Sequence, residues 1–265
     1  MLRYEVGGDH VGRITLDRPD AANALTVEMR DDLVDAVRAC RADDDVRSVL
    51  VTATGDSFCS GMDLRGSTVA QAGTDGFDPR STSQALRIGV QTFVQELWEL
   101  DKPTVAAVHG PAVGPGAHLA LACDFVLTCD TTKFLWSFAR WGLVVDAGGA
   151  YLLPRLVGLP RAKAMVMLGE GAVGTEAVDL GLAYKHIGMA DEMAEHAEAL
   201  AVRLAAGPTR SLGLSKQLLN RSFETDLAHS LELEGHFQAL ATASSDLVEG
   251  MGAFKEKRPP DFTGH

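Results

Sequence analysis

The sequence predicts an α/β fold in which helices cover a parallel or mixed sheet. Four short segments have the apolar pattern of buried or half-buried strands, namely residues 11–16, 48–52, 104–108 and 125–128. Helical patterns alternate with these segments, and Gly-rich turns follow the second and the third. Alternation of strands and helices is typical of this fold class.

The first elements have clear boundaries. Residues 11–16 alternate apolar and polar side chains, the period of a half-buried strand. The run Asp-Arg-Pro-Asp at 17–20 ends that strand. Thr26 can cap a helix over residues 27–42, because its hydroxyl can accept a hydrogen bond from a free N–H of the first turn. One face of that helix is apolar and contains Met29, Leu33, Val37 and Cys40.

Two turn-to-helix junctions follow buried strands. Residues 53–64 form a Gly/Ser-rich turn that leads into a helix, and the segment from His109 leads from a Gly-rich turn into an apolar helix. The N–H groups at a helix start have no internal partner, so two such starts facing each other would bind an oxyanion. The alternative is that both junctions are ordinary loops between a strand and a helix and bind nothing. Between the junctions we expect a surface loop over residues 65–83 that covers a site, and a helix over 83–100.

The last third of the chain is predominantly helical. We expect helices over residues 162–168, 174–180, 190–206, 208–221 and 223–249, followed by a short helix at 252–257 and a tail. This pattern divides the chain into a core of residues 1–200 and a helical C-terminal region of residues 201–265.

Composition excludes several classes of protein. The net charge of −12 argues against nucleic acid as the main partner. No apolar stretch reaches the roughly 18 residues that a membrane helix requires, and the N-terminus lacks the apolar core of a signal peptide. The four cysteines form no CxxC pair and no metal-ligand cluster, so we expect no metal site. Reduced, buried thiols in a cytoplasmic protein are the simplest interpretation.

Six motifs in order carry a resemblance to a known family. They are ITLDRPDAANAL (14–25), GDSFCSGMDL (55–64), KPTVAAVHGPAVGPGAHLALACDF (102–125), FARWGLVVDAGGAYLLPRLVG (138–158), GEGAVGTEAVDLGL (169–182) and GMGAFKEKRPPDF (250–262). With them the chain resembles the crotonase, or enoyl-CoA hydratase/isomerase, superfamily. The resemblance implies a spiral of repeated ββα units with a helical C-terminal trimerisation region. It also implies a homotrimer or hexamer and an acyl-CoA thioester substrate, with coenzyme A as part of the substrate and no separate cofactor.

The family's oxyanion hole consists of two backbone N–H groups. The resemblance assigns one to Met62, which on its side chain alone would be a plain core methionine. The second is altered, because the family's three glycines are Gly114-Pro115-Gly116 here and proline has no N–H. Pro115 suits the first position of a helix. We expect the second donor to shift to Gly116 or to be replaced by water.

The catalytic acid also departs from the hydratase pattern. The two glutamates of the family's hydratases correspond to His118 and Phe138 here, so water addition is disfavoured. Asp146 corresponds to the aspartate with which the family's isomerases move a proton between carbons. Apolar neighbours would raise its pKa and make it a stronger base. Alternatively, Asp146 merely caps a helix that starts near Ala147.

The resemblance also suggests contacts with coenzyme A. The adenine is expected near Ala22 and Ala24 and along the backbone of Ser60, Asp63 and Leu64. Phe254 and Lys257 match residues that reach the nucleotide, often from a neighbouring subunit. Arg18 is a weaker candidate for a phosphate contact. The Gly-rich turns contain no Walker A lysine, and no GxGxxG follows a strand.

These observations leave three functional hypotheses. The first is an enoyl-CoA isomerase with Asp146 as acid and base. The second is a hydratase or acyl-CoA hydrolase that uses His118 together with Asp146. The third is a non-catalytic acyl-CoA-binding trimer whose oxyanion hole is impaired by Pro115. His118 itself is either an acid/base near its ordinary pKa of about 6.5 or a satisfied polar residue of its helix.

Overall fold

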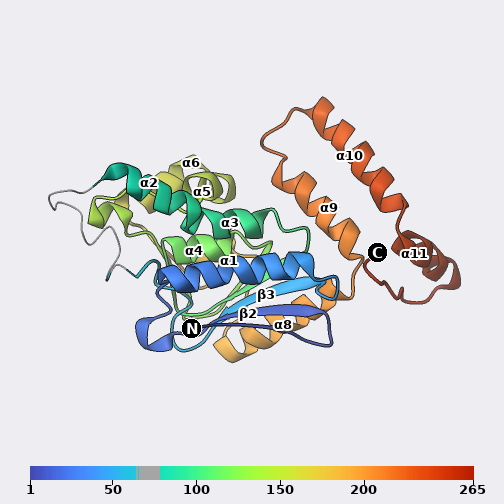
Figure 1. Ribbon diagram of the computed structural model, residues 1–265, viewed down its shortest axis with the longest axis horizontal. Helices are drawn as coiled ribbons and strands as arrows, with labels where there is room; N and C mark the ends of the chain where they lie inside the picture. Colours follow the sequence, from blue (N-terminus) through green and yellow to red (C-terminus); the bar gives the residue numbers. More distant parts are fainter. Residues whose placement is uncertain (64, 66–77) are drawn as a thin grey trace.

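The computed structural model describes residues 1–63, 65 and 78–265 (Figure 1). Leu64, most of the expected loop over 65–83 and the helix expected to follow residue 64 lie outside these residues. None of the described helices combines the length and the apolar character that a membrane crossing needs.

The main sheet joins strands from both ends of the core. Its order is β1-β2-β3-β4-β6-β9, with β1 antiparallel to β2 and the other pairs parallel. Its strands are β1 (Leu2–Val6), β2 (Val11–Leu16), β3 (Ser48–Ala53), β4 (Thr104–Val108), β6 (Phe125–Thr128) and β9 (Lys185–His186). The four strands expected from the sequence are confirmed, and β1 and β9 flank them.

A second, smaller sheet gives the chain its spiral course. Its order is β5-β7-β8, and its strands are β5 (Pro111–Val113), β7 (Lys133–Leu135) and β8 (Ala172–Val173). Cys59 extends it through a parallel bridge to Ala112 of β5. The chain therefore alternates between the sheets: β3 is followed by Cys59, β4 by β5, and β6 by β7. Each turn of the spiral therefore places one segment of the chain in each of the two sheets.

Helices cover both faces of the main sheet (Figure 1). One face packs against α1 (Val27–Ala42), α3 (Val90–Trp98) and α4 (Pro115–Leu121), and the other packs against α8 (Ala190–Ala205). Alternate strand residues point to alternate faces. Thus Val49 and Val51 belong to the first core, whereas Leu50 packs with Ala197 and Ala201 of α8 in the second.

The expected α1 is confirmed over its full range. Thr26 caps it, since its Oγ1 accepts a hydrogen bond of 3.2 Å from the N–H of Met29. The predicted apolar face is buried, with Met29, Leu33, Val37 and Cys40 all at 0% exposure.

Two expected helices are each divided. The helix expected over 83–100 is α2 (Pro79–Ile88) and α3, separated at Gly89. Because Asp78 caps α2 and Pro79 starts it, residues 79–83 are helical rather than loop. The helix expected over 223–249 is α10 (Leu227–Thr242) and α11 (Ser245–Glu256), and α11 absorbs the short helix expected at 252–257. Ser244 starts α11 by accepting a hydrogen bond from Leu247 N–H.

The remaining elements are short or were expected only in part. They are η1 (Pro19–Ala21), η3 (Phe138–Trp141), α5 (Gly149–Val157), α6 (Leu159–Lys163), the π-helical η4 (Ala164–Leu168), α7 (Glu176–Asp179) and α9 (Thr209–Asn220). The helix expected to start near Ala147 is α5, which starts two residues later at Gly149. The boundary expected between residues 200 and 201 falls within α8, which buries Met193, Ala197, Ala201 and Ala205 against the sheet.

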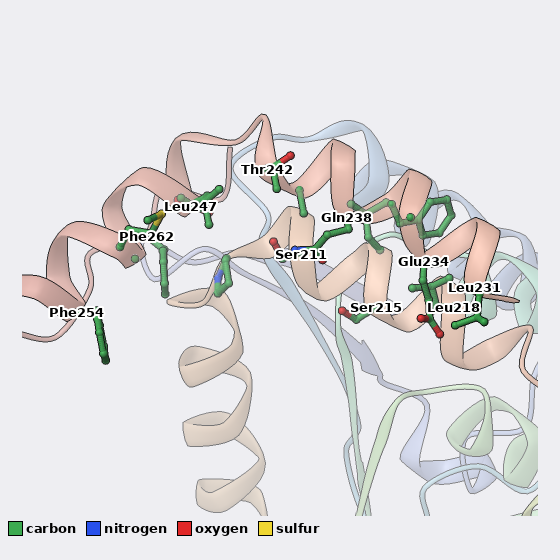
Figure 2. A pocket seen from close by; sticks show the side chains of 18 of the residues that line it. Ser211, Ser215, Leu218, Leu231, Glu234, Gln238, Thr242, Leu247, Phe254 and Phe262 are labelled. Carbon is green, nitrogen blue, oxygen red and sulfur yellow. The ribbon is translucent and has the colours of Figure 1, made fainter.

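The C-terminal helices extend away from the core. In Figure 1, α10 and α11 lie at the end of the molecule opposite α2. They form a groove of about 960 Å³ with α9 (Figure 2). The buried Lys216 anchors α9 to the core, because its Nζ lies 3.0 Å from Oδ2 of Asp124 and donates to the carbonyl of Leu97.

Candidate functional site

The two Gly-rich turns lie directly against each other. Cys59 exchanges backbone hydrogen bonds with β5, donating to Pro111 O at 3.1 Å and accepting from Val113 N at 2.9 Å. A Cβ on Gly116 would lie only 2.7 Å from Cβ and 2.8 Å from Sγ of Cys59. Gly61 has a φ of +92°, and a Cβ there would lie 3.0 Å from Val113 O. Glycine at positions 61 and 116 therefore permits this close contact.

A cavity of about 290 Å³ opens beside these turns. Its walls come from the start of α1, from α2 and α3, from both turns and from the segment around η3. The lining residues are Val27, Arg30, Ser60, Gly61, Met62, Thr82, Ala85, Leu86, Val90, Val113, Gly114, Pro115, Ser137, Phe138, Trp141, Leu143 and Asp146. The cavity is thus mainly apolar with a few polar groups, which is the usual composition of a small-molecule site.

Met62 offers a backbone donor at this cavity. Its neighbours are engaged on both sides, since Gly61 O accepts from Leu25 N at 2.8 Å and Asp63 N donates to Leu25 O at 2.9 Å. Between them, the Met62 N–H donates to no acceptor in the described part of the chain. An unpaired N–H beside an apolar cavity is suited to hold a carbonyl oxygen.

The second turn supplies fewer donors. Pro115 occupies the first position of α4, and Gly114 caps that helix with a φ of 50°. The Gly114 N–H already donates to Leu135 O at 2.8 Å. Gly116 has a helix-start N–H without an intrahelical acceptor, but it is buried against Cys59 and does not line the cavity.

Asp146 brings a carboxylate to the same cavity as Met62. Its Oδ1 is buried and has no hydrogen-bond partner among the residues that the structure describes. Burial raises the pKa of this carboxyl to about 6, while a hydrogen bond with its own backbone acts weakly in the opposite direction. A carboxylate that is poorly solvated and near neutral pKa is suited to accept and return a proton.

Asp146 does not cap α5. That helix starts at Gly149, and its cap residue Gly148 makes no side-chain hydrogen bond. The alternative in which Asp146 caps a helix starting near Ala147 is therefore wrong. Ala147 instead has a φ of 45°, a left-handed conformation that is unfavourable for alanine.

His118 lies behind the cavity wall. It is fully buried, and its Nε2 accepts a hydrogen bond of 3.0 Å from the indole N–H of Trp136. Its ring stacks on Phe138 with the ring centres 6.0 Å apart, and Phe138 is the residue that faces the cavity. Burial lowers the pKa of His118 to about 4. The imidazole is neutral and does not line the cavity, and its Nδ1 has no hydrogen-bond partner in the described part of the chain. His118 is therefore only partly satisfied in the core, and direct acid/base action by this residue stays a prediction.

The residues expected at the nucleotide gather at one edge of the cavity. Ser60 N donates to Ala22 O at 3.0 Å, which brings the first motif onto the 53–64 turn. Arg18 links them, donating to Ala24 O at 2.9 Å and to Oδ2 of Asp63 at 2.8 Å. Arg65 and then Arg18 hold the pKa of Asp63 well below its ordinary value. Leu64 lies outside the described residues.

Phe254 and Lys257 are not brought to the cavity in this chain. Both lie on or just after α11, remote from α2, and Phe254 is 85% exposed (Figures 1 and 2). Lys257 ends α11 in a left-handed conformation with a φ of 56°.

The sequence reasoning missed three polar side chains near the cavity. Arg30 and Thr82 line it, and Trp136 holds His118 behind it. Arg30 could have been noticed from the sequence, because it is a charged residue on the predicted apolar side of a helix. Nothing local marked Thr82 or Trp136.

Comparison with known proteins decides the family. Residues 7–265 match the family described as enoyl-CoA hydratase/isomerase. The chain belongs to the enoyl-CoA hydratase/isomerase family. Members of this family process acyl-CoA thioesters, so the expected enzyme class is confirmed.

Individual members of the enoyl-CoA hydratase/isomerase family are similar to this chain over nearly its whole length. The 1,2-epoxyphenylacetyl-CoA isomerase of Escherichia coli (strain K12) is 38% identical over 256 residues, covering 95% of this chain and 94% of that protein. The trans-2-decenoyl-acyl-carrier-protein isomerase of Streptococcus mutans is 30% identical over 254 residues, covering 96% and 95%. The crystal structure of an enoyl-CoA hydratase from Bacillus anthracis superposes with a TM-score of 0.90 at 28% identity, covering 100% and 99%. The expected crotonase fold is confirmed.

Proposed function

We propose that this family member is an enoyl-CoA isomerase in which Asp146 is the single acid and base. The observation that carries the proposal is the shared cavity of the Asp146 carboxylate and the Met62 N–H. Isomerisation requires one base that removes a proton and returns it to another carbon. The isolated, buried carboxylate supports that chemistry.

The proposed step is balanced without a cofactor or a metal ion. The Asp146 carboxylate takes a proton from C2 of a 3-enoyl-CoA, and the electron pair of that C–H bond delocalises onto the thioester oxygen. The Met62 N–H stabilises the resulting dienolate, with a water as the second donor in place of Gly116, whose N–H does not line the cavity. Asp146 then delivers the proton to C4, which leaves a conjugated 2-enoyl-CoA and the original carboxylate.

The geometry around His118 argues against the hydratase and hydrolase alternatives. Activation of water would need a second acid or base on the cavity wall, and that position is occupied by Phe138. His118 lies behind it with Nε2 engaged by Trp136. A non-catalytic binding role is disfavoured because a buried oxygen of Asp146 has no partner within the described ranges, a costly arrangement for a protein that only binds.

An assay with two substrates separates these functions. Incubation with 3-hexenoyl-CoA should give the conjugated 2-isomer, followed by ultraviolet absorbance and chromatography. Incubation with 2-hexenoyl-CoA should give no 3-hydroxy product. Water uptake that depends on His118 would support the hydratase, and acyl-CoA binding without either reaction would support the binding protein.

A ring epoxide is a second candidate substrate. The E. coli relative is named 1,2-epoxyphenylacetyl-CoA isomerase, and it shares 38% of its residues with this chain. Phe138 and Trp141 give the cavity the aromatic surface that a ring would contact. The same assay with 1,2-epoxyphenylacetyl-CoA tests this substrate.

We also propose that the chain assembles as a homotrimer or hexamer through its C-terminal region. The groove between α9, α10 and α11 exposes Leu231, Met251 and Phe254 (Figure 2). In such an assembly Phe254 and Lys257 would reach the nucleotide of a neighbouring copy, near Ala22, Ala24, Ser60 and Asp63. Light scattering after size-exclusion chromatography tests the mass. A cytoplasmic location is proposed as well, supported by the four buried, unpaired cysteines.

A further inference from the structure

The cavity has a polar wall that the proposed proton transfer does not use. Arg30 of α1 and Thr82 of α2 line the same cavity as Asp146. Arg30 is only 8% exposed, and a buried cation is costly unless its donors are satisfied. Arg30 and Thr82 come from α1 and α2, whereas Met62 and Asp146 come from the 53–64 turn and the segment after η3.

The Arg30 guanidinium is only partly satisfied. Its Nε and Nη2 both donate to Oδ1 of Asp31, at 2.8 and 2.7 Å. Its Nη1 donates to no acceptor in the described ranges. The Oγ1 of Thr82 is likewise buried without a partner. Two unpaired polar groups thus line one cavity, and each would gain from an oxygen atom supplied by a ligand.

The break between α2 and α3 makes room for the guanidinium. A Cβ on Gly89 would lie 3.0 Å from Cζ of Arg30 and would also overlap Nη1. The same Cβ would also overlap the backbone O of Ala85, so both the α2 backbone and the guanidinium favour glycine at this position. Gly89 therefore leaves the space in which the Arg30 guanidinium lies.

We propose that Arg30 and Thr82 bind an oxygen acceptor on the distal part of the acyl group. This inference rests on the proposed function, because it assigns the acyl group of that substrate to the cavity. A cavity of about 290 Å³ admits a short acyl group. The preferred substrates are then short enoyl thioesters that carry a hydroxyl or carboxylate oxygen beyond the reacting carbons. A site built to hydrogen-bond such an oxygen rejects the analogue that lacks it, since its own polar groups stay unpaired.

Matched substrates test the inference through a specificity ratio. Values of kcat/KM are measured for 6-hydroxy-3-hexenoyl-CoA, for the corresponding distal carboxylate and for 3-hexenoyl-CoA. The wild type should prefer an oxygenated substrate by about tenfold or more, and Arg30→Met should lower that ratio by about tenfold. Thr82→Val, which keeps the side-chain shape, should lower it by a smaller factor. The proposal is overturned if the ratio is unchanged in both variants or if the wild type prefers the methyl-terminated chain.

A binding measurement keeps this test separate from the proposed function. Hexanoyl-CoA, 6-hydroxyhexanoyl-CoA and 5-carboxypentanoyl-CoA contain no double bond, so calorimetry reports only their Kd. Tighter binding of either oxygenated chain, lost in Arg30→Met or Thr82→Val, supports the inference even if no isomerisation is detected. Equal Kd values for the three chains overturn it even if isomerisation occurs. Whichever of the hydroxyl and carboxylate chains has the lower Kd carries the oxygen that the site prefers.

Discussion

The Nε2 atom of His118 accepts a hydrogen bond of 3.0 Å from the indole N–H of Trp136, and both side chains are buried. Since Nε2 is the acceptor, a neutral ring carries its proton on Nδ1. This pair places the imidazole behind Phe138 and leaves Asp146 as the titrating group of the cavity wall. The first predictions follow from that division.

Loss of His118 should lower stability. In His118→Leu the buried N–H of Trp136 has no acceptor, which should reduce the free energy of unfolding by about 1–3 kcal/mol. Urea unfolding measures the change. The double variant His118→Leu/Trp136→Phe removes both polar groups, so its loss should be smaller than the sum of the two single losses. Strictly additive losses would show that the two side chains do not interact.

Activity should depend on one ionisation near pH 6. Burial raises the pKa of Asp146 to about 6, and a base must be deprotonated to act, so kcat/KM should rise with pH and level off above that value. His118 should cause no second change in kcat/KM near neutral pH, because its pKa is lowered to about 4. A bell-shaped profile with a second pKa between 6 and 7 that disappears in His118→Leu would contradict this assignment.

Asp146→Asn should make the protein more stable at neutral pH. The folded-state pKa of Asp146 is raised from 3.8 to about 6, so between these values the folded protein holds a proton that the unfolded chain has released. Stability of the wild type therefore falls as pH rises through this window. The variant lacks the penalty and should be more stable at pH 7 by on the order of 2 kcal/mol, after allowance for partial solvation.

Unfolding curves from pH 3 to pH 8 test this linkage. The difference between the two proteins should nearly vanish at the acidic end, where the wild-type carboxyl is protonated in both states. A difference that is constant across the range would mean that the substitution acts through packing and not through ionisation.

Gly116→Ala should destabilise the contact between the turns. The added Cβ would lie 2.8 Å from Sγ of Cys59, and such overpacking costs about 1–3 kcal/mol. Gly252→Ala is a matched control within α11, because a Cβ there meets nothing within 4 Å. The control should be neutral or stabilise the helix by about 0.5–1 kcal/mol. Equal effects of the two substitutions on urea unfolding would contradict the close contact.

Much of the fold could be predicted because local signals and packing agree. The cap Thr26 and the apolar face of α1 gave its bounds, and β2, β4 and β6 carry apolar runs between clear turns. The divided helices could not be predicted. At Gly89, which separates α2 from α3, the chain lies against the Arg30 guanidinium, and no local pattern contains that contact. Likewise, Ser244 caps α11 in a stretch that reads as continuous helix.

The cavity could be predicted only where the motifs mark it. Ser60, Met62, Gly114, Pro115, Phe138 and Asp146 all line it, in the segments that carry the family resemblance. His118 was ambiguous because its burial depends on Trp136 and Gly149, which reach it through tertiary contacts. Arg30 and Thr82 were missed for the same reason. A residue's chemistry can be read from the sequence, whereas its solvent and its partners depend on the folded chain.

The most direct test of the central claim is the conversion of 3-hexenoyl-CoA by wild type and by Asp146→Asn, with kcat and KM measured separately. If the Asp146 carboxylate moves the proton beside the Met62 amide, the variant should lose about 10²–10⁴-fold in kcat while its KM changes little. Retention of a tenth or more of the wild-type kcat by a correctly folded variant would contradict the account.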